Sequence, residues 1–160
     1  MLSVEMIQTL GDYHIAMTRR VWESIDQITE EQYLAEDAYS RGSIRNLMVH
    51  LASTDRRWLT GMKNQPDVGH LKFEDYPGRA AGHELFEKVA RDFSEYTHTV
   101  TEEELGQKPP QFTNPRWAVL LHLINHGTDH RSTVLQRLTG LGAPIFDQDL
   151  IIWLMNRKGN

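Results

Sequence analysis

Two histidines, His126 and His130, stand four positions apart in a stretch with helical periodicity. On an α-helix this spacing places both imidazole rings on one face, about one turn apart. Two nitrogen ligands at this spacing suit a single divalent metal ion, as in helical zinc sites with an HxxxH pair. The motif is short, so the same pattern is also compatible with two half-buried histidines that only form hydrogen bonds.

A third ligand has to come from another part of the chain. His122 continues the series upstream, but it is rotated by about 80° from His130 around the helix, so we interpret it as a flanking residue. His50 is the best-placed candidate because it borders the apolar face of its own segment. His14 falls on the apolar stripe of the first segment, which favours a buried core residue. The remaining histidines are expected to be solvated: His70, His83 and His98.

Four long segments carry the apolar periodicity that would position these histidines. Apolar residues recur every three or four positions in residues 10–28, 43–62, 85–100 and 114–140. A long loop over residues 64–82, rich in Pro and Gly, separates the second segment from the third. A short apolar segment, residues 150–155, follows the fourth. Period-2 alternation is absent, so we predict an all-α fold, a four-helix bundle with a short C-terminal fifth helix.

Local signals mark several helix ends. Ser43 is a good N-cap for the second segment, and Thr29 with Gln32 forms a capping-box pattern that opens a short turn. Asn114 is the predicted N-cap of the fourth segment, with Pro115 at its first helical position. Gly140 is its predicted end.

The composition limits the classes of function. The 160 residues fit one domain, residues 1–160, with 39% hydrophobic and 24% charged residues, as in ordinary globular proteins. A net charge of -5 without a basic cluster argues against nucleic acid as a partner. The absence of cysteine excludes disulfides, thiolate zinc sites and cysteine nucleophiles. The sequence shows no signal peptide or apolar run of membrane-spanning length, so we expect a cytoplasmic protein without a membrane partner.

Two stretches resemble the motifs of a known family. Residues 42–50, GSIRNLMVH, followed by Trp58 and Leu59, resemble the second-helix motif of the DinB family of metal-binding bundles. Residues 121–131, LHLINHGTDHR, followed by Leu138 and Gly142, are similar to its fourth-helix signature. Residues 149–151 are similar to its closing segment, so the resemblance covers nearly the whole chain.

This resemblance implies a four-helix bundle that binds one divalent metal ion per chain through His50, His126 and His130. Many members continue the fourth-helix signature as HRGQ, whereas Ser132 and Thr133 follow Arg131 here. This departure spares the ligands, but it leaves open any helix contact that depends on the small glycine. Related proteins include thiol-dependent transferases and isomerases, beside many members without an established reaction.

The expected function is a metal-dependent enzyme that acts on a small molecule, for instance a thiol-dependent S-transferase with a thiol cosubstrate. A bound zinc or nickel ion on three imidazoles would keep a position for water or substrate. The alternatives are a metal-dependent hydrolase and a non-catalytic, metal-stabilised binding module. A hydrolase usually needs a carboxylate base, and both Asp55 and Asp129 are poorly aimed for that role.

A homodimer is the expected assembly. The apolar segment 150–155 and two aromatic residues that we expect to be exposed, Trp22 and Trp153, motivate this prediction. The dimeric state common in the family supports it.

Overall fold

The computed structural model describes residues 3–157, and over this range it is all helical. The predicted fold class is therefore confirmed. Four long helices form the bundle: α1 (Val4–Ile25), α3 (Ile44–Met62), α4 (Arg79–Thr99) and α6 (Arg116–Gly140). Four short ones complete it: α2 (Glu30–Leu34), the 3-10 helix η1 (Phe73–Asp75), α5 (Glu102–Gly106) and α7 (Leu150–Arg157). The domain limits 1–160 stay a prediction, and their ends lie outside the described residues.

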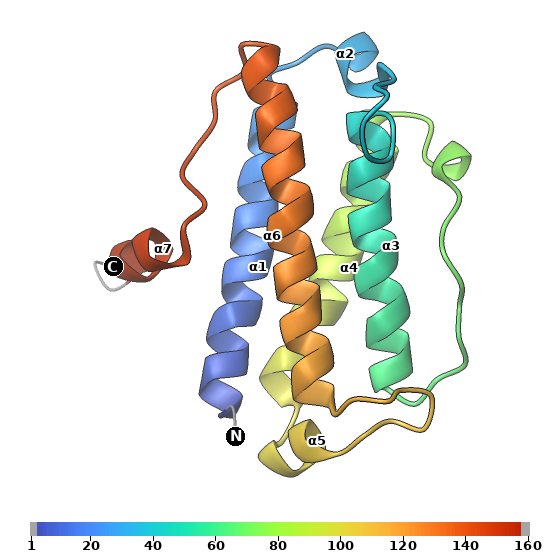
Figure 1. Ribbon diagram of the computed structural model, residues 1–160, viewed down its shortest axis with the longest axis vertical. Coiled ribbons are helices and arrows are strands. Elements are labelled where there is room, and N and C mark those ends of the chain that lie inside the picture. Colours follow the sequence, from blue (N-terminus) through green and yellow to red (C-terminus); the bar gives the residue numbers. More distant parts are fainter. Residues whose placement is uncertain (1–2, 158–160) are drawn as a thin grey trace.

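The long helices lie side by side, and α7 stands apart from them beyond a connecting segment (Figure 1). Each of α1 and α3 contacts both α4 and α6. Helices α3 and α6 are thus direct neighbours, while α1 and α3 lie diagonally across the bundle. In the described part of the chain, no helix is both long and apolar enough to span a membrane.

The predicted helix starts are confirmed at two places and wrong at one. The Ser43 hydroxyl accepts a hydrogen bond from the backbone of α3, and the capping box of Thr29 opens α2. Helix α6, in contrast, begins one residue later than predicted, because extended Pro115 occupies the N-cap position. The side chain of Asn114 therefore does not cap the helix, and it donates to Thr113 instead.

Trp22 is not exposed, and this corrects one argument for a dimer. Its side chain is 1% exposed and lies against Tyr33 and Phe86 from α2 and α4. The single apolar stripe predicted for the first helix missed this contact, because α1 is covered from more than one side. Several large apolar residues of the described range are exposed, and three of them lie on α7: Ile151, Ile152 and Met155. The homodimer stays a prediction.

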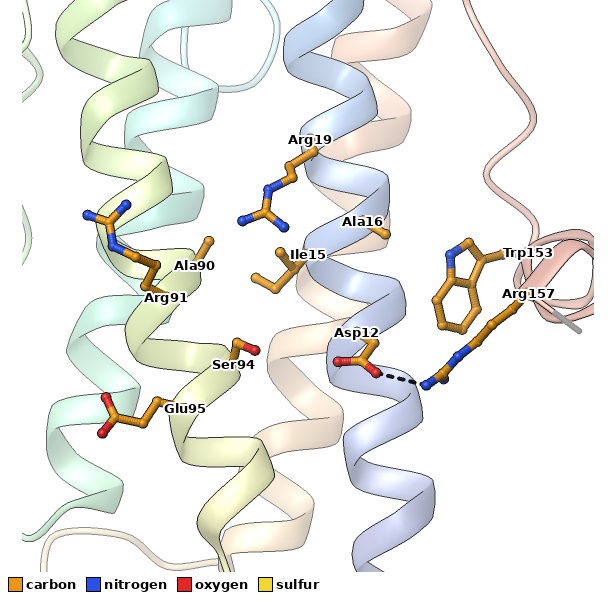
Figure 2. Close-up of a pocket in the computed structure, with 10 residues that line it drawn as sticks. All are labelled: Asp12, Ile15, Ala16, Arg19, Ala90, Arg91, Ser94, Glu95, Trp153 and Arg157. Atoms are coloured by element: carbon orange, nitrogen blue, oxygen red, sulfur yellow. Dashed lines mark hydrogen bonds and ion pairs between the residues drawn. The ribbon is translucent and has the colours of Figure 1, made fainter. Parts of the chain in front are cut away.

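Helix α7 is held to α1 by an aromatic contact and an ion pair. The half-buried ring of Trp153 meets Tyr13 edge-on, with 5.7 Å between the two ring centroids. Arg157 forms an ion pair with Asp12 at 3.1 Å (Figure 2). A groove of about 430 Å³ lies between α1, α4 and α7. No histidine lines this groove, so it is separate from the metal chemistry predicted from the sequence.

Candidate metal centre

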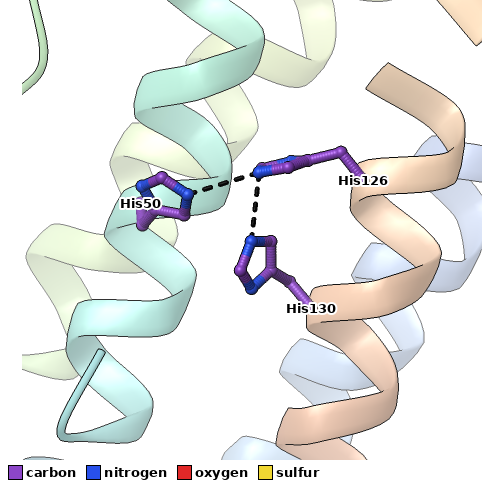
Figure 3. A group of neighbouring side chains, drawn as sticks. All are labelled: His50, His126 and His130. Atoms are coloured by element: carbon purple, nitrogen blue, oxygen red, sulfur yellow. Dashed lines mark hydrogen bonds between the residues drawn. The ribbon is translucent and has the colours of Figure 1, made fainter. Parts of the chain in front are cut away.

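His126 and His130 project from α6 toward α3, where they meet His50 (Figure 3). Buried Leu123 and Val134 hold this part of α6 against the bundle, and the two histidines lie half-buried at its edge. His50 is buried on α3. The contact between α3 and α6 therefore brings His50 together with His126, which lies 76 residues later in the sequence.

The three imidazoles converge through their Nε2 atoms. The Nε2 atom of His126 lies 3.3 Å from that of His50 and 3.0 Å from that of His130. One ligand nitrogen from each ring lies within 4.8 Å of the other two. Two nitrogens bound at about 2.1 Å to a tetrahedral ion would be about 3.4 Å apart. The spacing and the donor type thus fit a single divalent ion.

Burial lowers the pKa of all three rings. The pKa of His50 falls to about 3 and that of His126 to about 4, mainly because burial disfavours the charged imidazole. The guanidinium of Arg41 lowers the pKa of His50 further. The pKa of His130 is also lowered, again mainly by burial. All three rings are therefore neutral near pH 7, which is the form that binds metal.

The sequence matches the family model described as the DinB family over residues 5–158, nearly the whole chain. The chain belongs to the DinB family. The resemblance seen in residues 42–50 and 121–131 is thereby confirmed. Comparison with curated proteins finds none that matches this sequence.

His14, near the three histidines of this DinB-family chain, is a core residue as predicted. Its Nδ1 atom lies 3.1 Å from a guanidinium nitrogen of Arg131, which can only donate, so Nδ1 is the acceptor. The ring proton is then on Nε2, which donates to Asp55 at 2.9 Å. Both ring nitrogens are engaged, so His14 cannot supply a fourth ligand without breaking this buried network.

Asp55 belongs to this network rather than to the ligand cluster, which agrees with its predicted poor aim. One carboxylate oxygen accepts from His14, and the other is buried without a hydrogen-bond partner. The carboxylate nevertheless opposes the lowering of the pKa of His126 and His130, so its charge lies near both rings. The Nδ1 atoms of these two histidines are also buried without partners. Asp55 therefore influences His126 and His130 electrostatically, without a hydrogen bond to either ring.

The remaining histidines have different surroundings. His122 is exposed and meets Trp58 edge-on, outside the cluster, as expected for a flanking residue. His83 stacks on Trp22, and His98 pairs with Asp12 at 2.8 Å. Both side chains remain partly exposed, so the expected solvation holds only in part.

His70 lies closer to the site than sequence reasoning indicated. Its ring centroid is 6.0 Å from that of His50, and its Nε2 atom accepts a hydrogen bond from Arg57. The loop after α3 folds back along that helix, and Ser53 accepts a bond from the backbone N–H of Leu71. No helical periodicity exists in this loop, so its path could not be derived from spacing.

Ser132, where many DinB members have glycine, causes no steric conflict. It lies on the surface, donates to the Thr128 carbonyl and accepts from the Gln148 side chain. The close contact between α6 and the His14 side chain of α1 lies five residues earlier, at Gly127. A β-carbon at Gly127 would overlap the ring of His14 and lie 2.9 Å from the guanidinium of Arg131.

Gly127→Ala is therefore expected to lower the free energy of unfolding by about 1–2 kcal/mol, even though alanine favours helix. Urea denaturation of the metal-free protein measures this effect. Gly140→Ala is the matched control on the same helix, because a β-carbon there meets open space. Equal stability of both variants would contradict the described packing of His14 on α6.

Acid should destabilise the metal-free protein. The pKa values of His50 and His126 in the folded state, about 3 and about 4, lie below the ordinary value of 6.5. Between these values the unfolded chain binds more protons, so the free energy of unfolding falls as the pH falls. From pH 7 to pH 5 we expect a loss of about 1–2 kcal/mol, after discounting for partial exposure. Urea titrations of chelator-treated protein at both pH values measure this loss of unfolding free energy. The double variant His50→Gln/His126→Gln should lose less than the unmodified protein. An equal loss in both would show that these two histidines do not cause the acid sensitivity.

Proposed function

We propose that this DinB-family protein binds one divalent ion, zinc or nickel, through His50, His126 and His130, and that it is a metal-dependent enzyme acting on a small molecule. The observation that carries the proposal is the convergence of three neutral Nε2 atoms on one point. Imidazole suits both metals, so the ligands leave the choice between them open.

The proposed centre has room for an exogenous ligand. Among residues 3–157, no carboxylate and no other histidine joins the cluster, and His14 is engaged by Arg131 and Asp55. Three imidazoles do not fill even a tetrahedral shell. When bound, the ion would act as a Lewis acid that lowers the pKa of a coordinated thiol or water.

Thiol transfer is the reaction that we favour. A hydrolase usually needs a carboxylate base beside the attacking water, and no described carboxylate belongs to the cluster. A thiol needs no such base, because its proton is lost to solvent when its pKa falls. Its sulfur then forms a bond to an electrophilic carbon, and the leaving group departs with the electron pair of the broken bond.

The protein part of this chemistry is positioning. Helices α3 and α6 hold the three rings neutral and oriented, and burial keeps protons from competing for the ligand nitrogens. A non-catalytic, metal-stabilised binding module remains the alternative, since an ion on these ligands would link α3 to α6. The two differ in whether an exogenous thiol can bind.

The test uses protein purified without a histidine tag, stripped with chelator and reloaded with zinc, nickel or cobalt. A small thiol and an electrophilic aryl chloride serve as substrates. We expect S-arylation that disappears on chelation and returns with metal, and thiolate charge-transfer absorption in the cobalt-loaded sample. The same protein carrying His126→Ala is the control. A thiol that neither reacts nor changes the cobalt spectrum would favour the binding module.

A further inference from the structure

A small pocket of about 200 Å³ opens beside His50, one of the three clustered histidines. It lies between α3 and the loop that follows it, and His50 belongs to both the pocket and the ligand cluster. The other residues that line the pocket include charged, polar and apolar side chains: Arg41, Ser53, His70, Leu71 and Phe73. A molecule in this pocket would therefore lie next to the proposed metal centre.

The charge in the pocket comes from Arg41. Its guanidinium forms no ion pair with any residue in the range 3–157, and no carboxylate lines the pocket. Among neighbouring charges, Arg41 has the largest effect on the pKa of His50, and it also lowers the pKa of His130. The guanidinium thus acts electrostatically on the ligand cluster, and it forms no ion pair with a described carboxylate.

The backbone around Arg41 is tied to both helices that carry the ligands. The side chain of Asn46, on α3, donates to the Arg41 carbonyl at 2.9 Å. Arg137, on α6, donates to the carbonyls of Tyr39 and Gly42 on either side of it. Left-handed conformations shape this turn, with Gly42 at a φ of 87°. Arg41 is therefore presented on an anchored turn.

The apolar residues of the lining are also anchored. Leu71 and Phe73 pack against a small core cluster that includes Val49 and Ala52 of α3. The N–H of Leu71 donates to Ser53 at 2.8 Å, which fixes the loop on the helix. The pocket thus combines one guanidinium with apolar side chains.

We propose that this pocket binds the carboxylate of a small organic acid through Arg41, with the reactive group of the acid at the open face of the three histidines. This inference rests on the proposed function and names its substrate class. A volume of about 200 Å³ holds roughly six water-sized groups, which fits a short acid. A guanidinium can bind either a carboxylate or a phosphate through two hydrogen bonds, but its single positive charge balances a carboxylate and leaves one charge of a phosphate dianion unpaired.

The experiment compares two thiols of equal chain length, 3-mercaptopropionate and 3-mercapto-1-propanol, by calorimetry on the zinc-loaded protein. We expect the acid to bind about tenfold more tightly than the alcohol, because only the acid can pair with Arg41. Arg41→Gln should remove this preference. Arg91→Gln should keep it, since Arg91 is an exposed arginine on α4 that lines the remote groove of Figure 2.

Two readouts separate this inference from the proposed function. Charge-transfer absorption of the cobalt-loaded protein reports whether a thiol reaches the metal, and its absence with both thiols would contradict the proposed function alone. The pocket is then judged with propionate and 1-propanol, which carry no thiol. An equal affinity for acid and alcohol in the unmodified protein, or an acid preference that survives Arg41→Gln, would overturn the carboxylate pocket.

Discussion

Replacing His130 with alanine is expected to weaken metal binding by more than about 100-fold, beyond the 10–100-fold loss typical of residues that hydrogen-bond to metal ligands. The reason is geometric: two imidazoles remain, and no carboxylate or histidine of residues 3–157 lies in the cluster to replace the third. His126→Ala should have the same effect. Isothermal titration with zinc measures the affinity of the tag-free protein.

Helicity should survive these substitutions, because the buried apolar faces of the four long helices carry the fold. His122→Ala is the matched control, since it removes a histidine of the same helix that lies outside the cluster. A His130→Ala protein that binds zinc as the unmodified chain does would remove His130 from the ligand set. Collapse of its circular dichroism without a change in metal content would mean that the histidines serve packing.

Replacing Asp55 with leucine is expected to cost about 3–5 kcal/mol of stability, the range for removing one partner of a buried charged network. Arg131 is fully buried, and Asp55 is the carboxylate linked to it through His14. Without that charge, the guanidinium stays in the core uncompensated and the Nε2–H of His14 loses its acceptor. Urea denaturation of metal-free protein measures the loss.

A surface ion pair provides the control for the stability loss expected in Asp55→Leu. Glu87 binds Arg19 through two hydrogen bonds, yet both side chains are partly exposed to solvent, so Glu87→Gln should cost only about 0–1 kcal/mol. Asp55→Asn keeps the shape of the side chain but removes its charge, and its loss of stability should fall between those of Asp55→Leu and Glu87→Gln. It provides the test if the leucine variant does not fold. A loss below that of Glu87→Gln in either Asp55 variant would contradict a charge-compensating role for Asp55.

The common face of the two α6 histidines and the helices themselves could be predicted because they depend on local spacing. The interval between His126 and His130 fixes their common face, and apolar periodicity with the caps at Thr29 and Ser43 defines the helices near them. His50 is the best-placed third candidate because it borders the apolar face of its own segment, but periodicity does not show which helices are neighbours. The family motif supports the same residue, and the contact between α3 and α6 agrees with it.

The buried network could not be predicted for the same reason. The spacing between Asp55 and His50 describes only their relative positions on α3. The hydrogen-bond partner of Asp55 is His14, which lies on the diagonally opposite helix α1. Arg131 was known only as part of a motif, and nothing in its spacing indicated that a charged side chain would be fully buried. Such contacts depend on the three-dimensional arrangement of α1, α3 and α6.

The central claim is that one divalent ion is held by His50, His126 and His130. Anomalous diffraction at the absorption edge of the metal, from crystals of tag-free protein supplied with one equivalent of zinc, tests it most directly. We expect one peak per chain, about 2.0–2.1 Å from the three Nε2 atoms. A chain without a peak between these rings, or with its zinc bound elsewhere, would contradict the claim.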